Sequence, residues 1–222
     1  MLARGAEAEL YLVEWGGREA VLKRRVAKPY RHRVIDERLR RERTLAEARM
    51  LARAVELGVD APALYEARLR DAEIVMEYVP GVSLRWWLEE RGLDGVAAAA
   101  ARRLGEMIGL LHEHGFTHGD VTTSNLIVSG ERFVLIDFGL SSASRDPLDQ
   151  AVDVHLFLRA VESTHPEHAG RLFTLFLEGY RRVRGEAAAR EVLEGVGRIR
   201  LMGRYVEARR RSVWGGVGEP RV

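Results

Sequence analysis

The sequence predicts an α+β chain of two lobes, in which a small strand-rich lobe precedes a larger helical one. Three observations carry this prediction. Short β-rich runs and one long helix are predicted within residues 1–78. The tripeptide Val79-Pro80-Gly81 then has the composition of a linker. Residues 79–222 have helical periodicity apart from one hairpin. We therefore expect an N-lobe at residues 1–78, a C-lobe at 79–222 and a ligand cleft between them.

The expected N-lobe begins with a hairpin. Strands are predicted at residues 9–14 and 18–24, with Trp15-Gly16-Gly17 as the turn between them. Apolar residues then recur at helical spacing from Ile35 to Leu57, and Gly58 follows as a C-cap. Two further strands are expected, at residues 63–68 and 73–77.

The expected C-lobe is mostly helical. Helices are predicted at residues 84–91 and 96–114, where Gly115 provides the stop. A hairpin follows, with strands near 126–128 and 133–136. Further helices are predicted at about 149–163, 167–184 and 186–194, with a possible continuation through the arginine-rich end. The sequence shows no internal repeat.

Composition favours a fully folded cytoplasmic protein. The 222 residues are 46% hydrophobic and include no cysteine, which excludes disulfides and thiolate metal sites. The longest apolar stretch, residues 96–101, is far shorter than a membrane span, and the N-terminus lacks the pattern of a signal peptide. We expect no membrane association.

Positive charge is unevenly distributed along the chain. The formal net charge is only +2, and of 35 lysines and arginines only Lys23 and Lys28 are lysines. The segment from Lys23 to Arg53 is strongly basic, and further arginines gather near the C-terminus: Arg198, Arg200, Arg204, Arg209, Arg210 and Arg211. Such blocks hint at a polyanionic partner, although many similar runs are simply solvated helix faces.

The run His118–Gly139, HGDVTTSNLIVSGERFVLIDFG, carries the chemistry. Asn125 follows Asp120 by five residues, and Asp137 follows it by 17, with an apolar strand pair between them. Asn125 and Asp137 can converge on one divalent cation, and their oxygen atoms suit Mg²⁺ rather than Zn²⁺. Asp120 is then left to face a hydroxyl group or a water molecule. These are the parts that phosphoryl transfer requires.

Residues of the expected N-lobe complete a nucleotide site. On a strand, Val21 and Lys23 lie on the same face. Val21 can therefore line the adenine while the ammonium group of Lys23 pairs with phosphate. Glu47 is the best counter-charge for Lys23; the alternative is surface pairing with Arg43 along the helix. The segment Gly5-Ala6-Glu7-Ala8 can bring backbone N–H groups to a phosphate, or it can be an ordinary turn.

These residues, in this order, resemble the protein-kinase-like superfamily over nearly the whole chain. The resemblance implies that Lys23 and Glu47 form the strand-to-helix ion pair, and that Met76 guards the back pocket. It implies that Glu77-Tyr78-Val79 is the hinge that binds adenine, with Ile127 and Ile136 also lining the nucleotide site. Asp120 matches the catalytic aspartate, and Asn125 and Asp137 match the Mg²⁺ ligands.

Departures from the superfamily pattern narrow the resemblance. Gly119 and Thr122 stand where an arginine and a lysine are usual, and only about ten residues separate Gly139 from Asp149, too few for an extended activation segment. The GAEA loop, the helix motif around Thr44, HGD-x-TTSN, IDFGL and the motif from Asp149 to Ala160 are similar to the small atypical kinase family of the KEOPS complex.

This resemblance implies a minimal bilobal kinase fold and a Ser/Thr kinase that uses ATP and Mg²⁺, phosphorylates itself and acts mainly as an ATPase. It implies work with the threonylcarbamoyl-transferase subunit and other KEOPS subunits in forming N6-threonylcarbamoyladenosine at tRNA position 37. The basic patches and the C-terminal tail would contact tRNA, in a salt-dependent way.

Two other functions remain open at this point. One is a small-molecule phosphotransferase of the aminoglycoside or choline kinase type, which also uses His-Gly-Asp with Asn five residues after the aspartate, although little chain is available to cradle an acceptor. The other is a tRNA-binding scaffold in which catalysis is dispensable, although the set of Lys23, Glu47, Asp120, Asn125 and Asp137 is intact.

Overall fold

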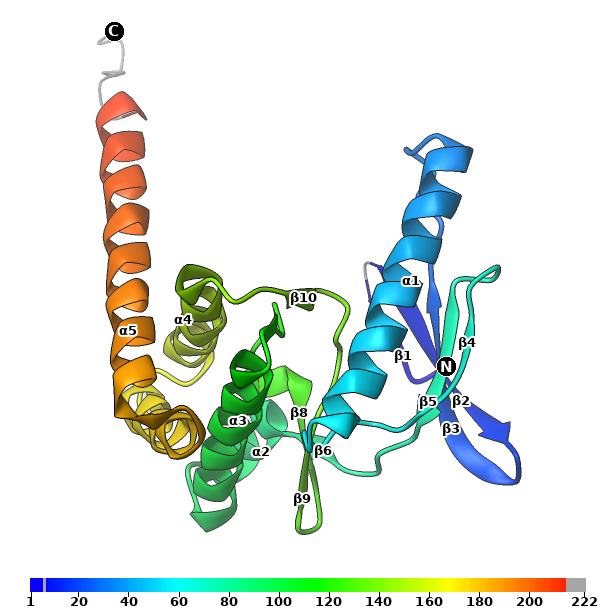
Figure 1. The fold of residues 1–222 in the computed structure, drawn as a ribbon, viewed down its shortest axis with the longest axis horizontal. Coiled ribbons are helices and arrows are strands. Elements are labelled where there is room, and N and C mark those ends of the chain that lie inside the picture. The colour runs from blue at the N-terminus through cyan, green and yellow to red at the C-terminus, as the bar shows by residue number, and fades with distance from the viewer. Residues whose placement is uncertain (6, 215–222) are drawn as a thin grey trace, which may run out of the picture.

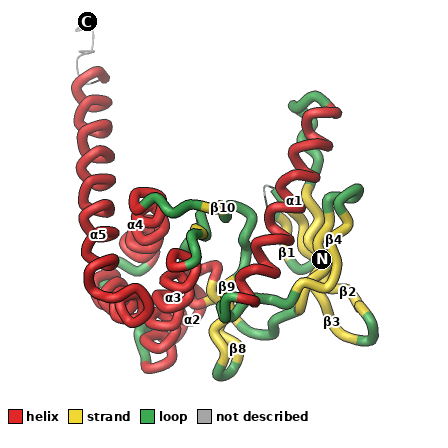
Figure 2. Tube along the Cα trace, viewed as in Figure 1, coloured by secondary structure: helices red, strands yellow, loops and turns green. Residues whose placement is uncertain are grey.

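The computed structural model describes residues 1–5 and 7–214, and for residues 203–214 it describes the backbone alone. It confirms the predicted α+β class, because the strands of an antiparallel sheet gather in the N-terminal part and helices dominate the C-terminal part (Figures 1 and 2). The exact lobe boundary at residues 78 and 79 stays a prediction. The side chains of Arg204, Arg209, Arg210 and Arg211, and residue Ala6, lie outside what is described.

The N-terminal sheet has five antiparallel strands in the order β1-β2-β3-β5-β4. These are β1 (Ala3–Arg4), β2 (Ala8–Trp15), β3 (Arg18–Arg25), β4 (Leu64–Arg68) and β5 (Glu73–Glu77). Gly16 and Gly17 join β2 to β3 with φ angles of 56° and 77°, the left-handed pair that suits a two-residue hairpin turn. The predicted strands are therefore found, and β1 is an addition.

Helix α1 (Arg33–Glu56) connects β3 to β4 and packs against β4 and β5. Its buried face repeats at helical spacing and includes Glu47, Ala48, Leu51 and Ala54. The helix begins two residues earlier than the apolar pattern predicts. It ends before Gly58, whose φ of 81° allows the left-handed turn at its C-terminus.

The C-terminal part combines helices with one small hairpin, which packs against α2 and α3. Its elements are β6 (Val82–Ser83), α2 (Leu84–Arg91), α3 (Gly95–Glu113), β7 (Phe116–Thr117), β8 (Leu126–Ser129), β9 (Arg132–Leu135), β10 (Ser142–Ala143), α4 (Pro147–Thr164) and α5 (Ala169–Trp214). Strands β6, β8 and β9 form one sheet, and β7 pairs with β10. Only residues 140–146 lie between Gly139 and α4, so the expected absence of a long activation segment is confirmed.

The core of this part lies where α3 meets α5, which also packs against α4. The contact between α3 and α5 is close because it uses glycine: a Cβ atom on Gly105 would lie 1.9 Å from the carbonyl oxygen of Phe176. Helix α5 is interrupted at Gly185, whose φ is 74°. This interruption agrees with the two separate helices that the sequence predicts before and after residue 185. Beyond it, the backbone stays helical to Trp214. No helix in the described part of the chain has the length and apolarity needed to cross a bilayer.

Candidate active site

A cleft of about 670 Å³ lies between the N-terminal sheet and the loops around the β8–β9 hairpin. Nearly all the residues that the sequence predicts for the site line this cleft. The predicted residues that line it are Gly5, Glu7, Ala8, Val21, Lys23, Met76, Glu77, Val79, Asp120, Asn125, Ile127, Ile136 and Asp137. Glu47 is buried directly behind Lys23.

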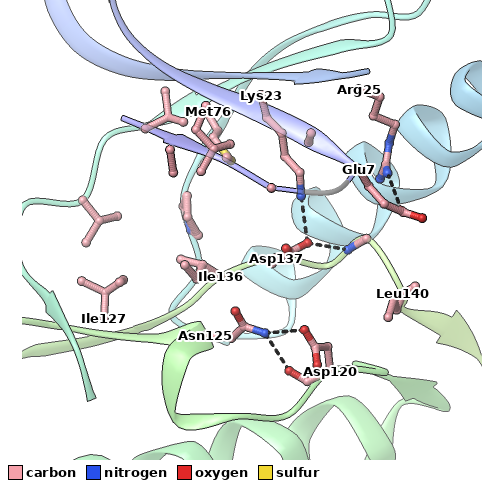
Figure 3. Close-up of a pocket in the computed structure, with 18 of the residues that line it drawn as sticks. Glu7, Lys23, Arg25, Met76, Asp120, Asn125, Ile127, Ile136, Asp137 and Leu140 are labelled. Carbon is pink, nitrogen blue, oxygen red and sulfur yellow. Dashed lines mark hydrogen bonds and ion pairs between the residues drawn. The ribbon is translucent and has the colours of Figure 1, made fainter. Parts of the chain in front are cut away.

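One end of the cleft is apolar and the other is charged (Figure 3). Strand alternation places Val21 beside Lys23 on the cleft face of β3, and the β3–β5 register sets Val21 opposite Met76. Met76, Ile127 and Ile136 form the apolar end, as Figure 3 shows. The cleft can therefore accept a ligand that has an apolar part beside Met76 and a negatively charged part beside Lys23.

The strand end at Glu77 has an altered hydrogen-bond ladder. The N–H of Glu77 donates to the carbonyl oxygen of Ala63 at 2.8 Å, as an antiparallel pair requires. The reciprocal donor, the N–H of Ala63, binds the carboxylate Oε2 of Glu77 at 3.1 Å instead. The side chain thereby takes a donor that the ladder would give to the main-chain carbonyl of Glu77.

Lys23 lies at the centre of the charged end. Its Nζ is 2.5 Å from Oε1 of Glu47 and 2.8 Å from Oδ1 of Asp137. Burial by itself lowers the pKa of Lys23, but the two carboxylates outweigh burial and raise that pKa above its ordinary value. Lys23 is therefore a fixed positive charge. The surface alternative for Glu47 does not occur, since Arg43 binds Glu7.

Asp137 has an unusual backbone conformation that turns its carboxylate into the cleft. Its φ of 64° lies in the left-handed region, which aspartate tolerates better than most residues. Oδ1 also accepts the N–H of Gly139 at 3.2 Å. Burial raises the pKa of Asp137, but the Lys23 ammonium and the Gly139 N–H outweigh burial and hold that pKa below its ordinary value. The carboxylate is therefore ionised at neutral pH.

Asn125 and Asp120 are joined directly. The side-chain amide of Asn125 donates to the main-chain oxygen of Asp120 at 2.9 Å and to its Oδ2 at 2.8 Å. These bonds use the amide nitrogen and leave the side-chain oxygen of Asn125 as an acceptor. That oxygen and the Asp137 carboxylate are hard donors of the kind that Mg²⁺ prefers.

The described residues include no cluster of three or more His, Cys, Asp or Glu side chains that would hold a metal by itself. A pair of protein ligands suits Mg²⁺, which commonly keeps water and phosphate oxygens in its remaining positions. The residues present therefore fit this ion.

His118 links the backbone segment that carries Asp120 to the one that carries Asp137. Its Nδ1 accepts the N–H of Asp120 at 3.2 Å, so the proton of the neutral ring resides on Nε2, which donates to the carbonyl oxygen of Ile136 at 3.2 Å. Complete burial lowers the pKa of His118, despite the opposing influence of nearby carboxylates, and keeps the ring neutral. The backbones that carry Asp120 and Asp137 are thus fixed relative to each other.

Asp153 of α4 anchors the loop that carries Asp120. Its carboxylate is 1% exposed and accepts the N–H groups of His118 at 2.6 Å and Gly119 at 2.7 Å. It also lies 3.1 Å from Nε2 of His112. The motif from Asp149 to Ala160 includes Asp153, but the sequence pattern does not reveal this anchoring role. Asp153 and the loop that it holds are 34 and 35 residues apart in the sequence, so no local pattern connects them.

Steric crowding explains why position 119, where kinases usually have arginine, is a glycine in this chain. Gly119 has a φ of 82°, and a Cβ atom there would lie 2.3 Å from the carbonyl oxygen of Leu140. The short segment after Gly139 therefore passes directly over this loop and leaves no room for a side chain.

Comparison with known proteins gives a consistent result. The family model described as the RIO domain matches residues 19–152. The KEOPS complex subunit Bud32 of Pyrococcus abyssi is 41% identical over 213 residues, which cover 93% of this chain and 96% of that protein. A probable bifunctional tRNA threonylcarbamoyladenosine biosynthesis protein of Methanothermobacter thermautotrophicus is 38% identical over 207 residues, 93% of this chain but 37% of the relative.

A solved structure shares the fold. The Rio2 kinase of Chaetomium thermophilum, in a complex with ADP, Mg²⁺ and phosphoaspartate, matches with a TM-score of 0.62 over 88% of this chain and 69% of that one. At 17% identity this likeness concerns the fold alone. None of these matches favours the aminoglycoside or choline kinase alternative.

Proposed function

Because the chain belongs to the RIO-domain family of atypical kinases, in the branch that includes the KEOPS subunit Bud32, we propose that it binds ATP with Mg²⁺ and transfers or hydrolyses the terminal phosphate. One observation carries this proposal. A buried, positively charged Lys23 lies between Glu47 and Asp137 in the same cleft as the Asn125–Asp120 pair.

Each residue has a distinct task in this proposal. The apolar end, with Val21, Met76, Ile127 and Ile136, holds the adenine, and the backbone of Glu77 and Val79 supplies its hydrogen bonds. Lys23 binds the phosphates, aided by the backbone of the Gly5–Ala8 loop.

Asn125 and Asp137 would hold Mg²⁺, which neutralises phosphate charge when it is bound. Because Asp137 pairs with Lys23 in the structure, nucleotide binding would exchange that partner of Lys23 for phosphate oxygens.

Asp120 orients the nucleophile. Its carboxylate, held by Asn125, can accept a hydrogen bond from a serine or threonine hydroxyl group or from a water molecule. Thr122 stands where kinases usually supply a lysine to the transferred phosphate, and the loss of that cation predicts slow transfer. This favours self-phosphorylation and ATP hydrolysis over rapid turnover of protein substrates.

We also propose a place for the chain in tRNA modification, which the names of its relatives suggest. It would act in the cytoplasm with the threonylcarbamoyl-transferase subunit and other KEOPS subunits in forming N6-threonylcarbamoyladenosine at tRNA position 37. Residues 23–53 hold 12 lysines and arginines against four acidic residues. The N-terminal end of α1 and the C-terminal end of α5, both in basic stretches, project towards the same edge of the molecule (Figure 1). This arrangement suits a phosphate backbone.

An aspartate substitution tests the chemistry. In Asp120→Asn, Mg²⁺-dependent ATP hydrolysis and self-phosphorylation should fall by about 100-fold or more, because the base is lost while the shape is kept. Asp71→Asn, an exposed aspartate in the β4–β5 turn, is the matched control and should retain full activity. Unchanged hydrolysis in Asp120→Asn would refute the assignment.

A reconstituted complex separates catalysis from scaffolding. We expect Asp137→Asn to slow tRNA modification, because phosphate binding would lose a metal ligand. Modification at the wild-type rate would favour the tRNA-binding scaffold instead.

A further inference from the structure

Arg25 is a buried arginine of the cleft for which neither the sequence motifs nor the proposed chemistry has a use. It is the last residue of β3, two positions after Lys23, and strand alternation puts both side chains on the same face. It is only 6% exposed and lines the charged end of the cleft. Buried arginines are rare unless they are paired, so its partners indicate its purpose.

Arg25 shares the carboxylate of Glu47 with Lys23. Nη2 of Arg25 lies 2.5 Å from Oε2 of Glu47, while Nζ of Lys23 lies 2.5 Å from Oε1. Each oxygen of Glu47 therefore has its own cation. Without Arg25, the Glu47 carboxylate could rotate and offer Lys23 either oxygen.

Arg25 also reaches the loop at the mouth of the cleft. Its Nη1 lies 3.8 Å from Oε2 of Glu7, and Figure 3 shows the two side chains facing each other. Glu7 in turn accepts from Nη1 of Arg43 on α1, at 3.0 Å to both oxygens. The result is a row of alternating charges that runs through Arg43, Glu7, Arg25, Glu47, Lys23 and Asp137.

This row connects four parts of the cleft: the loop of Glu7, strand β3, helix α1 and the segment of Asp137. Arg25 contacts both Glu7 and Glu47, and so links the loop of Glu7 directly to the carboxylate that binds Lys23. Its Nε is buried and has no hydrogen-bond partner among the described residues, so its burial is not explained by a complete set of bonds.

We propose that Arg25 is a positioning residue of the nucleotide site, which fixes Glu47 so that Lys23 is aligned on the phosphates and which couples the loop of Glu7 to that alignment. The inference rests on the proposed function. Because adenine contacts lie at the other end of the cleft, loss of Arg25 should affect the rate of phosphate transfer more than nucleotide affinity.

The test compares two adjacent arginines of one strand. Arg25→Met removes the positioning contacts, whereas Arg24→Met removes an arginine that points away from the cleft and bonds to Glu73 at 2.6 Å. Mg²⁺-dependent ATPase rates, the affinity for a fluorescent ADP analogue and thermal unfolding are measured for both variants, for Arg25→Lys and for wild type. We expect kcat of Arg25→Met to fall about tenfold or more, with affinity changed less than about threefold, since small misalignments cost rate. Arg24→Met should keep the wild-type rate.

Arg25→Lys retains the charge but only a single donor group, and we expect it to recover part of the lost rate. It also decides the matter if Arg25→Met fails to fold. Equal rates in Arg25→Met and Arg24→Met would overturn the inference, as would a loss of rate, affinity and stability together that Arg25→Lys does not relieve. A wild-type protein that binds no nucleotide in the presence of Mg²⁺ would instead overturn the proposed function, and this inference with it.

Discussion

The anchoring of the Asp120 loop by Asp153 leads to a prediction that does not depend on any assigned activity. Asp153 accepts the main-chain N–H groups of His118 and Gly119, one on each oxygen, in a site closed to water. Substitution by asparagine keeps the size and shape of the side chain. It replaces one oxygen with an NH₂ group, so whichever way the amide is turned, a donor faces at least one of the two N–H groups.

The magnitude follows from these contacts. A hydrogen bond to a charged acceptor contributes about 1.5–3 kcal/mol, and a buried donor left without a partner costs about 1–3 kcal/mol. One bond is lost and the other is weakened because the acceptor is no longer charged. We therefore expect Asp153→Asn to lower the free energy of unfolding by about 3 kcal/mol. At an m-value of about 2 kcal/mol per molar, this lowers the urea midpoint by roughly 1.5 M.

The assay is urea unfolding followed by circular dichroism. Asp149→Asn, on the same helix, is the control: its carboxylate is exposed and binds the Ser144 hydroxyl group at 2.6 Å, so its loss should cost less than about 1 kcal/mol. If Asp153→Asn unfolds at the same midpoint as Asp149→Asn, the anchoring argument is wrong. A destabilised but folded variant should also lose ATPase activity, because the loop that carries Asp120 is no longer held.

Two more predictions follow from the same region. Gly119→Ala should destabilise the protein far more than Gly130→Ala, because both glycines have positive φ but, of the two, Gly119 alone lies against Leu140. Equal urea midpoints of the two variants would show that the close approach is unimportant. Stability should also fall as the pH drops below about 6.5, by up to about 1.4 kcal/mol per unit for His118, since the unfolded ring takes up a proton that the buried ring resists. Urea midpoints measured at pH 7.5 and 5.5 test this prediction. The variant His118→Gln should reduce the difference between the two midpoints but not abolish it, because burial also lowers the pKa of His155 and His165. A pH dependence that is unchanged in His118→Gln would contradict the assignment.

Local patterns were sufficient for the larger elements. Helix α2 lies at residues 84–91, as expected, because Ser83 caps it by accepting the N–H of Trp86 at 3.2 Å and Gly92 ends it with a φ of 68°. Such caps and periodicities act within a few residues, so they are visible in a sequence. The two-residue strands β1, β6, β7 and β10 were not predicted, because a pair of residues has no period and becomes a strand only through its partner.

The sequence by itself determined the α+β class, the order of the larger elements and the residue types that one cleft would need, since these follow from spacing along the chain. Only the tertiary structure decided how the charges are shared. Glu47 divides its oxygens between Lys23 and Arg25, and Asp153 reaches a loop 34 residues away, because such contacts join different elements and carry no periodic pattern. Burial adds the last part: His118 is neutral because folding removes it from water, which its position in a motif does not reveal.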